Sequence, residues 1–118
     1  MRLDPDLCRR ILFAIEASDS PPGVEIRIDF GDEYAKAVVT EHVRLLAEEH
    51  LIEANSFLAY DPRGDRWVPI RLTADGHKFV SAARNDDNWD TAKRKFQELG
   101  GASVRMLLNI LLQGLLSG

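Results

Sequence analysis

Apolar residues recur at helical spacing along most of this chain. The pattern is clear near the N-terminus, where Leu7, Ile11 and Ile15 follow one another every four residues. The same period predicts further helices, and alternation of apolar and polar residues predicts strands. The expected helices span about 5–17, 33–49, 74–84, 89–99 and 102–116, and the expected strands span 24–28, 52–60 and 67–72. The mixture predicts an α+β fold.

Capping and turn residues support these boundaries. Asp4 is suited to cap the first helix, and Pro5 suits its first position because proline lacks the N–H that would otherwise be unpaired. Thr73 is expected to cap the helix that follows it. Residues 61–66 have the composition of a turn, so the strands on either side should form a hairpin. Pro69 cannot donate a ladder bond, which places its strand at an edge or a bulge.

Composition limits the class of protein. The 118 residues fit one domain, and 45% hydrophobic with 29% charged residues is typical of an ordinary globular protein. The single cysteine, Cys8, excludes an internal disulfide and fits a reducing compartment. The first residues do not resemble a signal peptide, so we expect a cytoplasmic protein. A net charge of −4 means that any nucleic-acid surface must be a local basic patch.

The order of elements resembles that of winged helix-turn-helix domains. Residues 39–52 are similar to a recognition helix that runs into the first wing strand, and residues 72–79 are similar to the Leu-Thr-x-x-Gly entry to the next helix. The resemblance implies a winged helix with a small antiparallel sheet and two additional C-terminal helices. It divides the chain into a winged-helix domain, 1–85, and a C-terminal helical extension that packs on it, 86–118. His50 stands where these domains usually have glycine for a left-handed turn, and the helix before the recognition helix is short.

A narrower resemblance is carried by a combination of residues in the second half of the chain. They are similar to a family of small bacterial and phage-associated proteins catalogued as a domain of unknown function. The similarity also takes in residues 12–16 and 19–21, so it covers most of the chain up to about Ser103. It implies a winged-helix fold and an association with mobile elements, but no activity. The residues are Leu72, Thr73, Gly76, His77, Phe79, Ala82, Ala83, Arg84, Asp86, Asp87, Trp89, Ala92 and Lys93.

The outward face of the expected recognition helix supplies candidate DNA-reading residues. Arginine can pair with guanine, and glutamate can accept from cytosine. Residues 36–49 nevertheless carry three acidic and two basic side chains, which suits a solvated helix face better than a polyanion. The wing tip could add contacts to phosphate or the minor groove, although Asp61 and Asp65 lie beside its arginines. The candidates are Lys36, Thr40, Glu41 and Arg44 on the helix, and Arg63 and Arg66 in the wing.

The last expected helix is apolar around most of its surface. Its apolar stretch is roughly 20 Å long, which is shorter than the ~30 Å hydrocarbon core of a bilayer. Arg105 is the one basic residue on its thin polar stripe, so an interfacial membrane helix is not favoured. A helix of this kind must be buried, either wholly on its own core or partly against a second copy. We favour a homodimer through Leu107, Leu108, Leu111, Leu112 and Leu115.

The chain shows no recognisable catalytic machinery. His42, His50 and His77 lack the spacing of metal ligands, and Cys8 lies near an apolar helix face rather than beside a base. The sequence has no nucleophile elbow, phosphate-binding loop or dinucleotide fingerprint. We therefore expect no enzyme, no metal and no cofactor.

Two functions remain. The first is a regulator of a mobile element or phage that reads double-stranded DNA through the recognition helix. The second is a protein-interaction module that uses the winged helix as a scaffold and binds another protein through its last helix. Basic residues that converge on one face would favour the first, and acids interleaved among them would favour the second.

Overall fold

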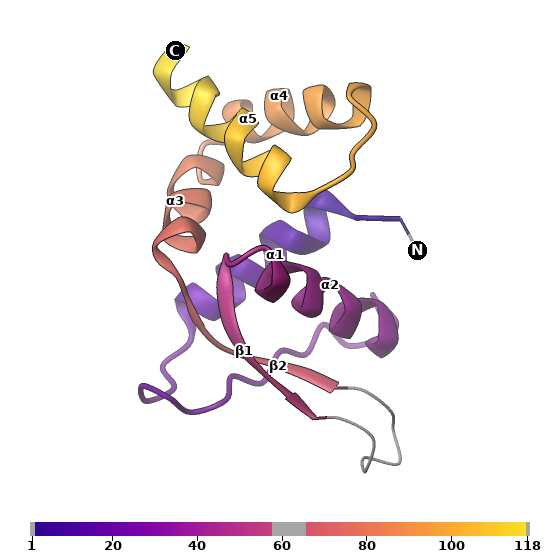
Figure 1. Ribbon diagram of the computed structural model, residues 1–118, viewed down its shortest axis with the longest axis vertical. Helices are drawn as coiled ribbons and strands as arrows, with labels where there is room; N and C mark the ends of the chain where they lie inside the picture. Colours follow the sequence, from indigo (N-terminus) through magenta and orange to yellow (C-terminus); the bar gives the residue numbers. More distant parts are fainter. Residues whose placement is uncertain (1, 58–65, 118) are drawn as a thin grey trace.

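The computed structural model describes residues 2–57 and 66–117. Within these residues the chain forms five helices and one two-stranded antiparallel sheet, which confirms the α+β class. The helices are α1 (Pro5–Ala17), α2 (Lys36–Glu48), α3 (Ala74–Ala83), α4 (Asp86–Glu98) and α5 (Val104–Ser117), and the strands are β1 (Ile52–Phe57) and β2 (Arg66–Leu72). The hairpin lies at one end of the molecule, and α4 and α5 lie against each other at the other end (Figure 1).

Three of the helices are capped at their N-termini by the side chain of the residue before the helix. Asp4, Thr73 and Asn85 each accept a hydrogen bond from the backbone N–H three residues ahead, at 2.9–3.2 Å. Each bond satisfies a donor that a helix N-terminus leaves unpaired. The first two caps are those predicted. The third starts α4 at Asp86, three residues before the predicted beginning at 89.

The end of α2 is closed by a left-handed turn. His50 has a φ of 66°, as its place in the winged-helix pattern predicts. Its N–H donates to the carbonyl of Ala47, and the Leu51 N–H reaches back to Leu46, both at 3.0 Å. This is the Schellman arrangement, in which a residue in the left-handed conformation satisfies the last carbonyls of a helix. The helix itself is a single piece that begins at Lys36, three residues later than predicted.

Residues 18–35 contain neither a helix nor a strand. The prediction of a strand over 24–28 is therefore wrong, and the short helix expected before α2 is replaced by turns. The side chain of Ile26 is buried as expected, and its N–H donates to the carbonyl of Pro69 at 2.8 Å. Proline has no N–H with which to complete an antiparallel pair, so within the described residues this segment makes one backbone hydrogen bond to β2.

Strands β1 and β2 form the predicted hairpin, although residues 58–60 of the predicted first strand lie outside the described residues. Their register shifts after Glu53: this residue pairs with Arg71, whereas Ala54 pairs with Pro69. Ile70 is the extra residue of a β-bulge. The prediction that Pro69 sits at an edge or a bulge is confirmed, since the bulge accommodates a residue without a donor.

The buried side chains form one cluster to which every helix and both strands contribute. Three leucines of α5 belong to it, Leu107, Leu108 and Leu111, and each is at most 2% exposed. Helix α5 packs mainly on α4 and α3. No helix in the described part of the chain is both long enough and apolar enough to cross a bilayer.

Candidate nucleic-acid and protein interfaces

Arg44, the one arginine on the predicted DNA-reading face of α2, is bound by two carboxylates of its own helix. Its guanidinium donates to Glu48 at 2.6 Å, and to Glu41 through Nε at 3.0 Å and through Nη2. The hydrogen bond from Arg44 lowers the pKa of Glu41, and the two carboxylates raise the pKa of the arginine. The charge and the donors that would contact a base are therefore already engaged.

The other predicted DNA-reading residues are less constrained. Lys36 is exposed at the start of α2 and makes no ion pair with a described residue, and Thr40 is half-buried one turn further on. Lys36, Thr40 and Arg44 follow one another at four-residue spacing, so α2 brings them to one side. Arg63 lies outside the described residues. Arg66 is the first residue of β2, but its side chain is outside the description as well.

A cleft of about 560 Å³ lies beside this side of α2. Glu41, Arg44 and Glu48 line it from the helix, and residues 101–104, which connect α4 to α5, line it as well, together with Leu3. The beginning of the C-terminal helix therefore stands close to the predicted recognition face. A helix that enters a major groove needs a clear outer face, because the groove is only about 12 Å wide.

Glu49 joins the end of α2 to the beginning of α5. Its carboxylate accepts hydrogen bonds from the backbone N–H groups of Val104 at 2.7 Å and Arg105 at 3.2 Å. The guanidinium of Arg105 in turn donates to the backbone carbonyl of Glu49 at 2.6 Å. The carboxylate thus caps a helix that lies 55 residues away in the sequence. Sequence reasoning counted Glu49 only as an acidic residue on α2, and no local signal indicated its partner.

The leucines predicted for dimerisation have different surroundings. Leu107, Leu108 and Leu111 are part of the monomer's core, so they are not accessible to a second copy. Leu112 is half-buried against the same core. Leu115 is 51% exposed, and Leu116, which was not among the predicted residues, is 89% exposed. The accessible apolar part of α5 is therefore its last turn.

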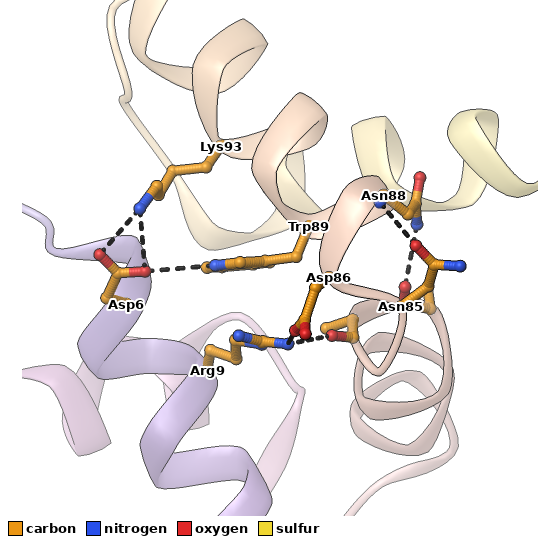
Figure 2. Close-up of polar contacts among 9 residues, drawn as sticks. Asp6, Arg9, Asn85, Asp86, Asn88, Trp89 and Lys93 are labelled. Carbon is orange, nitrogen blue, oxygen red and sulfur yellow. Dashed lines mark hydrogen bonds and ion pairs between the residues drawn. The ribbon is translucent and has the colours of Figure 1, made fainter.

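Two residues of the narrower family resemblance, Trp89 and Lys93, tie α4 to α1 (Figure 2). Asp6 of α1 accepts hydrogen bonds from the indole N–H of Trp89 at 3.2 Å and from Lys93 at 3.1 Å. Trp89 is 2% exposed, so its single polar atom is satisfied inside the interface. These motif residues have a structural role in this arrangement.

Arg9 of α1 reinforces the same interface (Figure 2). Its Nη2 donates to the carbonyl of Ala83 at 2.6 Å and to Asp86 at 3.0 Å. The guanidinium also lies about 5 Å from the ring centres of Phe13 and Trp89. Such a position over aromatic faces is favourable for a cation. Arginine, and not lysine, suits this place because its planar group can stack and donate at once.

His42 and Cys8 are both buried, and their contacts indicate structural roles. The Nε2 atom of His42 accepts the Asp4 N–H at 2.9 Å, which leaves Nδ1 to donate to the Val38 carbonyl at 2.8 Å. Burial raises the pKa of the Cys8 thiol well above its usual range. In the described part of the chain, no three histidine, cysteine or acidic side chains are grouped so that they could hold a metal ion.

Comparison with known proteins gives one family. The model of a family described as "hypothetical protein (DUF2513)" matches residues 2–103, which is most of the chain and stops immediately before α5. No curated protein and no solved structure matches. The match agrees with the resemblance to a family of unknown function that reached about Ser103. On this evidence the chain belongs to the DUF2513 family of hypothetical proteins.

Proposed function

We propose that this chain is a non-catalytic protein-binding module, in which a winged-helix scaffold presents the end of α5 to another protein. The observation that carries the proposal is the state of Arg44, which is held by Glu41 and Glu48. Binding to a polyanion requires cations that can replace counterions on phosphates. Helix α2 instead presents an arginine that its own acids neutralise.

The wider distribution of charge supports the same proposal. Basic side chains on the described helices and strands are mostly paired with carboxylates within 4 Å, so acids are interleaved among them. The pairs include Arg9–Asp86, Arg10–Glu33, Arg71–Glu53, Lys78–Asp75, Arg84–Glu16, Lys93–Asp6 and Arg105–Asp75. A surface in which acids alternate with bases suits a protein partner better than DNA.

The end of α5 supplies an apolar contact for such a partner. Leu115 and Leu116 are both largely exposed, one turn beyond the buried Leu111. The helix is packed against the core as far as Leu111, so its last turn is presented at the end of a buried helix. Exposed leucines next to a packed core are suited to fill a pocket on another protein.

The first experiment measures binding of the purified protein to random duplex DNA by fluorescence anisotropy, at low and then at physiological salt. The proposal expects no salt-sensitive binding. It also expects a stoichiometric protein partner whose capture is lost in Leu115→Asp and Leu116→Asp. Leu99→Asp is the matched control, because Leu99 is 66% exposed and lies at the end of α4. A partner that ignores both α5 variants would contradict the proposal.

A DNA-reading regulator of a mobile element is the second candidate. The order of α2, a left-handed turn at His50 and a hairpin favours it, because recognition helices in winged domains are followed in this way. In that case Glu41→Gln combined with Glu48→Gln should free Arg44 and strengthen DNA binding, and Arg44→Ala should weaken it. Salt-sensitive binding that responds in this way would replace the protein-binding proposal.

A further inference from the structure

His42 joins the middle of α2 to the beginning of α1. It is 0% exposed, whereas His50 and His77 are exposed. Its Nε2 atom accepts the backbone N–H of Asp4 at 2.9 Å, and its Nδ1 atom donates to the carbonyl of Val38 at 2.8 Å. An imidazole can accept a hydrogen bond only while it is neutral, because both nitrogens of the charged ring are donors. The contacts of His42 therefore require an uncharged ring.

Asp4 has two roles at this junction. Its backbone N–H is held by His42, and its carboxylate caps α1 by accepting the N–H of Leu7 at 3.2 Å. The carboxyl carbon of Asp4 is separated from its backbone nitrogen only by Cα and Cβ. Rotation of the side chain between its rotamers therefore moves the carboxylate oxygens relative to the His42 ring while the backbone stays in place.

Asp4 is also the carboxylate that is available to a charged ring. It makes no ion pair with a described residue, and burial keeps the thiol of Cys8, its neighbour on α1, neutral by raising its pKa. The other described carboxylates on the elements around His42 are already engaged: Asp6 by Lys93, Glu16 by Arg84, Glu41 and Glu48 by Arg44, Glu49 by the N-terminus of α5, and Glu53 by Arg71. The remaining cations of these elements are Arg9 and Arg10, which are paired, Lys36, which is exposed, and Arg66, whose side chain lies outside the description.

Protonation of His42 changes which bonds this junction can make. The new Nε2–H would face the N–H of Asp4, so two donors would meet without an acceptor, and a buried charge without a partner is costly. Both costs are relieved if the Asp4 carboxylate turns to accept from Nε2, because the pair then carries opposite charges. The same turn takes the carboxylate away from Leu7, so the first turn of α1 loses its cap.

We propose that His42 and Asp4 form a pH-sensitive switch between α1 and α2. With a neutral ring, the backbone N–H of Asp4 is held and its carboxylate caps α1. With a charged ring, the carboxylate pairs with the imidazole, and the segment before α1 is released. This segment carries Arg2 and Leu3, which line the cleft beside α2, so the switch loosens one wall of that cleft. It stands on the contacts of α1 with α2 and does not depend on what the end of α5 binds.

Nuclear magnetic resonance of the whole chain tests the switch between about pH 8 and pH 5, the range in which histidine changes charge. Proton–nitrogen correlations of the imidazole rings should show Nε2 of His42 without a proton at the upper end and with one at the lower end. Over the same range, hydrogen exchange of the Leu7 amide, corrected for the intrinsic effect of pH, should lose protection by roughly five-fold, the effect of a helix cap. The amide of Ile15, near the other end of α1, is the internal control. A ring that stays uncharged at the lower end, or a Leu7 amide that ignores its charging, would overturn the proposal.

Three variants separate the switch from a general sensitivity to acid. His42→Gln keeps an acceptor near the position of Nε2 but cannot be charged, so the protection of Leu7 should no longer depend on pH. His77→Gln removes an exposed histidine and is the matched control, which should respond as the wild type does. Asp4→Asn keeps a capping oxygen but no carboxylate, so charging of His42 should require a lower pH. If His42→Gln does not fold, Asp4→Asn still decides, because charging at the same pH as in the wild type would overturn the pairing of His42 with Asp4.

Discussion

At the scale of single residues, Gly76 shows why the Leu-Thr-x-x-Gly entry to α3 ends in glycine. The hydroxyl of Thr73 donates to the His50 carbonyl at 2.7 Å, and the backbone N–H of Thr73 donates to the Leu51 carbonyl at 3.0 Å. These bonds bring the first turn of α3 onto the turn that follows α2. A Cβ on Gly76 would lie 2.1 Å from the Leu51 carbonyl oxygen, closer than any real contact. The glycine is therefore required by the packing of two backbones.

Gly76→Ala should lower the free energy of unfolding by about 1–3 kcal/mol, because the backbone of the α2–β1 turn must move to admit the methyl group. Urea denaturation followed by circular dichroism measures the change. Ser81→Ala, on the exposed side of the same helix, is the control and should change stability little. Equal stability of the two variants would mean that the close approach at Gly76 does not exist in solution.

His50 is a second position where the backbone sets the preference. A side chain in the left-handed region costs about 1–2 kcal/mol relative to the right-handed helix, and glycine avoids this cost. His50→Gly should raise the free energy of unfolding by up to about 1 kcal/mol, since part of the gain is offset by the entropy of glycine in the unfolded chain. His50→Val should lower it. Thermal unfolding of the three proteins distinguishes these signs, and a destabilised glycine variant would contradict the assigned turn.

At the scale of helices and strands, α5 is attached to the rest of the molecule in two ways, through its buried leucines and through its N-terminus. Its leucines pack on α3 and α4, and its N-terminus is capped by Glu49 from the end of α2. Ser103 adds a local cap to the N–H of Met106 at 3.1 Å. The Glu49 carboxylate also lies at the positive end of the α5 dipole, where a negative charge is favourable.

Removal of this long-range cap should therefore be measurable. Glu49→Ala should lower the free energy of unfolding by about 1–2 kcal/mol, because two backbone N–H groups lose their acceptor. Hydrogen exchange should show that the first amides of α5 become less protected, while the protection of the α1 amides does not change. Glu98→Ala, an exposed acidic residue at the end of α4, serves as the control. An unaltered exchange rate at Val104 and Arg105 would refute the role of Glu49.

At the scale of the whole molecule, carboxylates paired with arginines make stability depend on pH. Hydrogen bonds from Arg44 and Arg71 lower the pKa values of Glu41 and Glu53 below the ordinary value of 4.5. A carboxylate whose pKa is lower in the folded state stabilises the fold above its unfolded pKa. This contribution is lost as the pH falls through the folded pKa.

The free energy of unfolding should therefore decrease below about pH 4.5 as these carboxylates are protonated. The double variant Glu41→Gln, Glu53→Gln should show a shallower decrease, because it has fewer paired carboxylates to protonate. Urea titrations between pH 7 and pH 3 compare the two proteins. Glu53 is exposed and Glu41 is half-buried at the surface, so salt can screen both pairs and the difference should shrink in high salt. Coincident profiles for the two proteins would show that these pairs do not contribute.

Much of the local structure follows from the sequence because its causes lie within a few residues. The caps at Asp4 and Thr73, the left-handed turn at His50 and the irregularity at Pro69 each depend on neighbouring backbone groups or on intrinsic backbone geometry. The pairing of Arg44 with its two glutamates has the same origin. The glutamates lie three and four residues from Arg44 on one helix, so the sequence could have predicted these ion pairs. The acidic and basic residues of this helix were counted in the sequence but were not paired with one another.

The sequence by itself thus determined the α+β class, the approximate elements, the hairpin and the membership in a family of unknown function. Only the tertiary structure decided which side of α5 is core and that its last turn is accessible, because an almost wholly apolar helix carries no periodic signal for direction. It also decided that residues 24–28 do not form a strand and that Glu49 caps α5. Those outcomes depend on partners 43 to 55 residues away along the chain, and local patterns do not encode such distances.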